Sequence, residues 1–382
     1  MILAGSIADG ERSADPETPA VSVIVATYNR CDVLGLALQS LLAQTLGDFE
    51  ALVVGDACTD NSEAVVRGFG DPRLHWHNLP SNSGSQAGPN NYALQVARGR
   101  YVAFLGHDDL WFPWHLEGLV GFIEETGADF VHSLAAMIDR RGVRSGIGPP
   151  EKGVPYAENH FPPSIWLHRR ELVNAVGLWQ DPTTLPWPID FDFMRQAALG
   201  GARIDFHPRL SVLKFPSPWF GPVYANIPTD REPPQTRYAR RMQRSPQRLE
   251  HDLLLQLAIV GARAVNGRGT LYFQRPAKLR SDVALMKLPW SLRRRLLDRG
   301  ILRLWPVREW LTWRYQRRRN AMRVKRGLLP AGVADLTVDS PEAAKVGGAA
   351  EETDYYRGSA PVIADRHSRF RAQRQQREEP FL

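Results

Sequence analysis

Two pairs of acidic residues have the type and spacing that acid–base or metal chemistry needs. Asp108 and Asp109 end the predicted strand at 100–109, and Asp190 and Asp192 begin a stretch with helical spacing. Carboxylates can hold a hard divalent cation or accept a proton from a hydroxyl group. Both pairs also suit the first turn of a helix, so a capping role is the alternative interpretation.

Further polar residues follow other apolar runs. Thr27, Tyr28 and Asn29 come after the run at 21–26, and Asp56 ends the run at 49–56. Such continuous apolar runs are typical of strands that are buried on both faces of a parallel sheet. The alternative is that Thr27 and Asn29 only form a turn and that Asp56 caps the next helix.

The order of the predicted elements indicates how these residues come together. Strands at 21–26, 49–56, 74–80 and 100–109 alternate with helices at 31–46, 58–70 and 90–99, the last closed by Gly99. This alternation predicts an α/β fold with an open parallel sheet and right-handed crossovers. Ligands of such folds bind at the carboxyl ends of the strands, which is where the polar residues stand.

The rest of the chain is less regular. Residues 116–126 and 169–177 have helical patterns, residues 129–138 look like a strand, and the Gly- and Pro-rich residues 142–163 are expected to be loop. A helix starts at Ser245-Pro246, a cap followed by a first-turn proline.

Four motifs in order resemble the family 2 glycosyltransferases of the GT-A fold. They are VSVIVATYNR (21–30), ALVVGDACTDNS (51–62), the stretch with Asn82, Gly84 and Asn91 that runs into ARGRYVAFLGHDDLWFP (97–113), and WPIDFDFMRQA (187–197). The resemblance covers nearly half of the chain. It implies a Rossmann-like, mostly parallel sheet with flanking helices, and inverting transfer from a nucleotide-sugar, with UDP or dTDP favoured.

The resemblance and the chemistry together assign expected roles. Asp190 is the expected catalytic base, and Asp108 the expected ligand of Mg²⁺ or Mn²⁺, which would neutralise the leaving diphosphate. Thr27, Tyr28 and Asp56 are expected to contact the nucleotide. The other expected substrate-binding residues are Asn29, Asn82, Asn91, His107, Asp109 and Asp192. Trp111, Trp114 and Trp187 could stack on an acceptor sugar or simply pack in the core.

The sequence departs from the family pattern at four positions. Gly106 stands where the metal motif has its first acid, and Gly55 where the second strand motif has one. Asn90 stands where many members have arginine, and Ile189 where the glutamate before the base is usual. A second hypothesis is therefore a catalytically inactive nucleotide-sugar-binding or membrane-associated scaffold.

The positive charge of the chain is concentrated in one segment. The net charge is +7, but residues 280–326 hold 15 Lys and Arg against 3 Asp and Glu, so the remainder is net negative. Arg interleaved with Trp and Leu suits an interfacial helix on an anionic membrane. A solvated helical bundle is the alternative, and no nucleic-acid recognition motif is present.

The order of these features predicts four parts and a cellular location. We expect a flexible leader (1–19), a GT-A domain (20–235), a helical basic region (236–330) and a disordered tail (331–382). Two cysteines without framework or metal-site spacing and no long apolar run favour a cytoplasmic protein, with docking on the inner face of the membrane and a lipid-linked acceptor as a further expectation.

Overall fold

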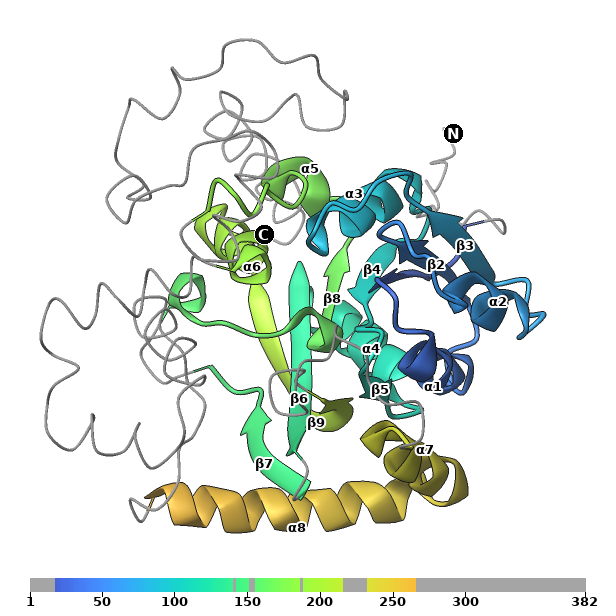
Figure 1. Ribbon diagram of the computed structural model, residues 1–382. Coiled ribbons are helices and arrows are strands. Elements are labelled where there is room, and N and C mark those ends of the chain that lie inside the picture. Colours follow the sequence, from blue (N-terminus) through green and yellow to red (C-terminus); the bar gives the residue numbers. More distant parts are fainter. Residues whose placement is uncertain (1–17, 140–141, 151–154, 186–187, 216–231, 266–382) are drawn as a thin grey trace, which may run out of the picture.

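A computed structural model describes residues 18–139, 142–150, 155–185, 188–215 and 232–265 of the chain (Figure 1). Most of the leader, Trp187, the basic segment 280–326 and the tail 331–382 lie outside the described residues.

The first half of the domain is a parallel sheet. Its strands are β1 (Val21–Thr27), β2 (Phe49–Gly55), β3 (Leu74–Asn78) and β4 (Tyr101–Phe104), in the spatial order β3-β2-β1-β4. All neighbours among these four strands pair in parallel. Because their apolar runs are buried on both faces, β1 and β2 form the centre of the main core.

Three helices connect these strands, namely α1 (Cys31–Leu42), α2 (Ser62–Arg67) and α3 (Ala87–Val96). The predicted helix at 90–99 was misplaced, because α3 begins earlier and ends at Val96. Gly99 does not close it. A Cβ at Gly99 would overlap the Ser22 backbone nitrogen, so the glycine allows the chain to pass close to β1.

The second half of the sheet is mixed. After β4 come β8 (Trp166–Arg169), β6 (Phe130–Asp139), β9 (Ile204–Lys214) and β5 (Leu110–Trp111), and β7 (Gly142–Ile147) pairs with β6. Only β6 and β9 pair in parallel there. The predicted α/β class is confirmed, and parallel pairing is complete only in the first half. The expected loop at 142–163 contains β7, and the expected helix at 169–177 is the end of β8 followed by α5 (Leu172–Val176).

Short 3-10 turns and four more helices complete the described chain. The turns are η1 (Tyr156–Glu158) and η2 (Pro163–Ile165), and the helices are α4 (His115–Thr126), α6 (Ile189–Leu199), α7 (Pro234–Arg244) and α8 (Pro246–Val265). Figure 1 shows α8 along the end of the β6–β7 hairpin, away from α5 and α6. None of the described helices has the length and apolar content to cross a membrane.

Helices α7 and α8 share a second apolar core with the sheet. Tyr238, Met242, Leu249 and Leu253 from the two helices pack with buried side chains of β5, β6 and β9. The described part of the chain after residue 235 is therefore packed on the sheet. The predicted boundary at 235/236 stays a prediction, since most of 236–330 is outside the described residues.

Candidate active site

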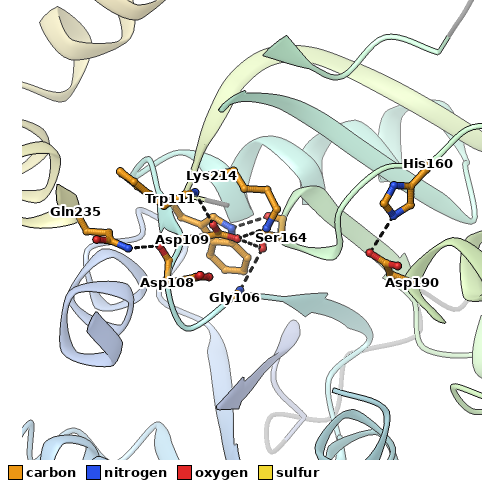
Figure 2. A network of polar contacts seen from close by, with 10 residues as sticks. Gly106, Asp108, Asp109, Trp111, His160, Ser164, Asp190, Lys214 and Gln235 are labelled. Atoms are coloured by element: carbon orange, nitrogen blue, oxygen red, sulfur yellow. Dashed lines mark hydrogen bonds and ion pairs between the residues drawn. The ribbon is translucent and has the colours of Figure 1, made fainter. Parts of the chain in front are cut away.

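The turn after β4 is held by a buried carboxylate. Asp109 is fully buried, and its Oδ2 accepts hydrogen bonds from the Ser164 hydroxyl and from Lys214 Nζ at 2.6 Å. Its Oδ1 accepts from the Phe215 backbone N–H at 3.1 Å. Figure 2 shows Ser164, from η2, and Lys214, at the end of β9, converging on Asp109. Asp109 thus ties three separate segments together, and its oxygens are directed at protein partners.

Two of the departures from the family pattern have a steric cause. A Cβ at Gly106 would lie 2.7 Å from Asp109 Oδ2, and a Cβ at Gly55 would lie 2.5 Å from Asn78 Oδ1. Distances this short are not found for real Cβ atoms, so neighbouring side chains must move to admit any residue but glycine. The space for the two missing acids is filled by Asp109 and Asn78.

Asp108 differs from Asp109 in its surroundings. Its carbonyl oxygen accepts from the Gln235 amide at 3.1 Å, and its carboxylate is not in a hydrogen bond with another described residue. Burial raises the pKa of Asp108, and the neighbouring Asp109 raises it further. Burial lowers the pKa of His107, with Arg30 adding to this effect. An ionised Asp108 would therefore gain from a cation placed against it.

A cation at this site would need ligands from the substrate in addition to the side chains of the protein. No group of three or more His, Cys, Asp and Glu side chains within the described ranges is arranged to hold a metal. Mg²⁺ is often held by one or two carboxylates with substrate phosphates as the other ligands. Asp108 fits that arrangement as the single protein carboxylate.

Four buried polar atoms near Asp108 lack hydrogen-bond partners among the described residues. They are Thr27 Oγ1, Arg30 Nη1, His107 Nδ1 and Gln235 Oε1. The backbone of Ala26, the residue before Thr27, interacts with the His107 ring. Arg30 and His107 both act electrostatically on Asp108, and Gln235 contacts its carbonyl. Most of the other such atoms in the described chain are ring nitrogens of buried His and Trp. Because buried polar groups are nearly always paired, this cluster has unused hydrogen-bonding capacity of the kind that a polar ligand supplies.

The residues after β1 and β2 brace one another. The Asp56 carboxylate accepts from the backbone N–H groups of Ser83 at 2.7 Å and Gly84 at 3.0 Å, and the Asn82 amide donates to the Asp56 carbonyl. Asn29, at φ 49°, exchanges hydrogen bonds with Thr59. Asp56 therefore holds the 82–84 loop and does not cap α2, while Asn29 joins two turns, in agreement with a turn-forming role.

Other expected contacts are occupied by the fold. Both ends of the Asn91 amide bond the Trp179 backbone, at 2.9 and 2.8 Å, which fixes α3 to the 177–180 segment. The indoles of Trp111 and Trp114 are buried and donate to the carbonyls of Ser164 and Leu210. These two tryptophans belong to the core and are not available to stack on a sugar. Tyr28 is partly exposed, and its ring remains accessible to a ligand.

The second acidic pair lies in the first turn of α6. Asp190 Oδ2 is 3.0 Å from His160 Nε2, and its Oδ1 accepts from the Phe191 backbone N–H (Figure 2). Burial alone would raise the pKa of Asp190, but His160, Phe191 and Lys214 outweigh it and hold that pKa below its usual value. Asp190 thus satisfies one backbone N–H in the first turn of α6, whose N-cap position is Pro188, and Asp192 is buried on the same helix.

Lys214 lies between the two acidic groups. Burial opposes its charge, but Asp109 and Asp108 outweigh burial and raise the pKa of Lys214, and Asp190 contributes as well. Sequence reasoning missed Arg30, His160, Ser164, Lys214 and Gln235. Arg30 stands in a quoted motif, so its place there was a usable signal. The other four come from loops, strand ends or helices outside the motifs and meet the site only through the fold.

Comparison with known proteins identifies the family that the first half of the domain matches. Residues 22–148 match the family model described as Glycosyl transferase family 2. This region belongs to glycosyl transferase family 2. The two structural departures within the glycosyltransferase region, Gly55 and Gly106, are therefore variations inside a family member. The match ends before Asp190, so the role of that residue rests on its surroundings.

Individual relatives agree with the family match. The glycosyltransferase region is similar to the Escherichia coli UDP-Glc:alpha-D-GlcNAc-diphosphoundecaprenol beta-1,3-glucosyltransferase WfaP, with 32% identity over 133 residues, 34% of this chain and 52% of that protein. It is also similar to the succinoglycan biosynthesis protein ExoO of Rhizobium meliloti, with 35% identity over 112 residues, 29% of this chain and 32% of that protein. The chain thus spans about half, or less, of the length of these relatives.

Among solved structures, the chain is similar to the crystal structure of S. aureus TarS 1-349 in complex with UDP-GlcNAc. The two sequences are 25% identical, the TM-score is 0.44, and the match covers 51% of this chain and 58% of that one.

Proposed function

We propose that this protein is an inverting glycosyltransferase that moves a sugar from a nucleotide-sugar, with UDP or dTDP favoured, to a hydroxyl acceptor in bacterial polysaccharide or glycolipid synthesis. The observation that carries the proposal is the cluster around Asp108 of four buried polar atoms that lack partners among the described residues. A diphosphate would supply acceptors for Arg30 Nη1, and a nucleotide would supply partners for Thr27. The named activity of the E. coli relative supports the same donor class.

The reaction follows from the two acidic groups. The acceptor oxygen attacks the anomeric carbon while the bond from that carbon to the diphosphate oxygen breaks, and the leaving diphosphate takes the electron pair. Asp190 accepts the proton of the acceptor hydroxyl as the new bond forms. A cation held by Asp108 and the diphosphate would offset the charge that develops on the leaving group. A single displacement of this kind inverts the anomeric configuration.

The test compares Asp190→Asn with the natural chain. Binding of UDP and dTDP is measured by calorimetry with and without Mn²⁺, and transfer from a panel of UDP- and dTDP-sugars onto lipid-linked and free sugars is followed by product release. We expect the variant to bind nucleotide and lose transfer by a factor of about 100 or more. Full transfer by the variant would refute the role of Asp190. Binding without turnover by the natural chain on every acceptor would favour the inactive scaffold.

The metal has a separate experiment. Asp108→Ala should weaken UDP binding in Mn²⁺ and have little effect in EDTA, because the carboxylate acts through the cation. Equal loss in both conditions would mean that Asp108 does not hold a cation. Arg67→Gln, an exposed change on α2, serves as the control in the same two solutions.

We also propose that residues 280–326 dock the protein on the inner face of the cytoplasmic membrane. Their Arg, Trp and Leu composition supports this, with an anionic lipid surface as the partner. Flotation of the full chain with vesicles of phosphatidylglycerol and phosphatidylcholine tests it against a chain that ends after residue 265. Unchanged flotation after truncation, or no flotation of the full chain, would refute the proposal.

A further inference from the structure

The contact between His160 and Asp190 has no assigned role in the reaction described above. His160 lies between η1 and η2, whereas Asp190 is 30 residues further along the chain on α6. The His160 and Asp190 side chains are only 18% and 16% exposed, so the contact is largely shielded from water. Figure 2 shows the imidazole directed at the carboxylate, apart from the Asp109 network.

The geometry also determines the direction of the hydrogen bond. An ionised carboxylate can only accept hydrogen bonds, so His160 Nε2 must carry the proton that lies between the two side chains. The second oxygen of Asp190 accepts from the backbone N–H of Phe191 at 3.0 Å. The carboxylate therefore has one donor on each oxygen, and these two donors fix the plane of the group.

On the basis of the proposed function, we propose that His160 is the positioning residue of Asp190, holding the carboxylate in the one orientation from which it accepts the proton of the acceptor hydroxyl. A rotated carboxylate would misplace its lone pair by about an ångström, and errors of that size cost about a hundredfold in rate. His160 acts through Asp190 and does not itself take the proton in this assignment.

Several elements near Asp190 carry titratable groups of their own. Lys214 of β9 acts on it electrostatically, and Asp192 lies two residues further along α6. From η1, Glu158 is exposed and Tyr156 bonds His132. Helix α5, which packs against α6, carries no titratable side chain. Among the described residues on these elements, His160 is the one that donates a side-chain hydrogen bond to Asp190.

The experiment compares two replacements of His160. His160→Phe keeps a ring of similar size but has no donor, and His160→Gln keeps an N–H donor near the position of Nε2. We expect His160→Phe to lower kcat between about tenfold and a hundredfold, with KM for the donor little changed, and His160→Gln to recover a large part of the rate. Glu158→Gln, a neighbouring exposed change, is the control and should leave kcat unchanged.

Two readouts separate positioning from a purely structural role. Without His160, the pKa of Asp190 rises, so the acidic limb of the pH–rate profile of His160→Phe should move to higher pH. Titration of the Asp190 carboxyl carbon by NMR, assigned with Asp190→Asn, measures the same change without any turnover. An unchanged acidic limb and an unchanged Asp190 titration in His160→Phe would overturn the inference.

The failure of this inference and of the proposed function are distinguishable. If Asp190→Asn loses transfer while His160→Phe retains full kcat, Asp190 is still the catalytic base and His160 has no part in positioning it. If the natural chain transfers no sugar, the proposed function fails, and the NMR titration still decides whether His160 controls the Asp190 carboxylate.

Discussion

Asp109 and Lys214 are separated by 105 positions in the chain, and their side chains meet at 2.6 Å. Asp109 is fully buried and the Lys214 side chain is 21% exposed, so this ion pair is largely inside the protein. It joins the turn after β4, which carries Asp108, to the end of β9, which precedes α7 in the chain. The pair therefore fixes the turn that carries Asp108 to the end of β9.

Replacing Lys214 by methionine tests this pair. Lys214→Met leaves the Asp109 carboxylate buried without its counter-ion, and we expect a loss of about 3 kcal/mol or more in the free energy of unfolding. Urea denaturation measures the loss. Arg203→Met, which breaks an exposed ion pair beside the start of the same strand, should cost less than about 1 kcal/mol. Equal stability of Lys214→Met and the natural chain would show that the pair contributes nothing.

Replacing Gly106 by the aspartate of the family motif should not create a stronger metal site. The Cβ of Gly106→Asp would overlap Asp109 Oδ2 at 2.7 Å, so we expect a destabilisation of about 1–3 kcal/mol and no gain in Mn²⁺ affinity. Gly121→Asp is the matched control, because a Cβ at Gly121 meets nothing within 4 Å. Thermal unfolding and Mn²⁺ calorimetry report the two effects. A stable variant with tighter Mn²⁺ binding would contradict the steric cause.

Arg30 is expected to contribute to donor binding. Its Nε and Nη2 bond Asp32, while its buried Nη1 lacks a partner among the described residues. Hydrogen bonds to charged groups contribute about 1.5–3 kcal/mol, so Arg30→Gln should weaken UDP binding by about tenfold or more. Arg67→Gln removes an exposed arginine of α2 and should leave the affinity unchanged. Calorimetry with UDP measures these affinities. Equal affinity of Arg30→Gln and the natural chain would show that Arg30 does not contribute to donor binding.

Three buried histidines should make the fold sensitive to acid. Burial lowers the pKa of His115 and His132 to about 3 and that of His168 to about 4, from an ordinary value of 6.5. The unfolded chain then binds these protons first. Their stabilising contribution is complete above pH 6.5 and is lost as the pH falls toward the folded values. Each histidine contributes a slope of about 1.4 kcal/mol per pH unit in that window.

Urea midpoints between pH 4.5 and 8 measure this slope. His132→Leu should reduce the slope of unfolding free energy against pH by the contribution of one histidine. This change in slope does not depend on how the substitution alters stability at pH 8. His251→Leu, which replaces an exposed histidine of α8, should leave the slope unchanged. A slope that is the same in His132→Leu and the natural chain would contradict the assignment.

The local sequence was sufficient for the first half of the sheet. Buried apolar runs such as Val21–Thr27 and Phe49–Gly55 pair in parallel, and their polar ends meet at one edge as expected. Those runs signal burial directly, and short connections leave few alternative topologies. The second half lacked such signals. β8 is four residues long and β5 only two, and their pairing is set by partners far away in the chain.

The same distinction applies to the candidate site. Asp108 and Asp190 could be selected because each stands in a recognisable motif. His160 and Lys214 could not, because a lone histidine in a proline-rich loop and a lysine ending a strand have no local pattern that indicates a carboxylate partner. Gly99 shows the opposite error. Its position suggested a helix end, whereas the nearby Ser22 backbone is the actual reason for glycine.

The packing of α8 has a consequence for how the protein could be oriented in the cell. Leu249 and Leu253 anchor this helix on the second core, and it runs along the β6–β7 end of the sheet, away from α6. The described end of α8 at Val265 therefore has a fixed place relative to the sheet. A surface that binds this end of α8 would also set which way the Asp108 edge of the sheet faces, so attachment of the protein would determine the orientation of its candidate site.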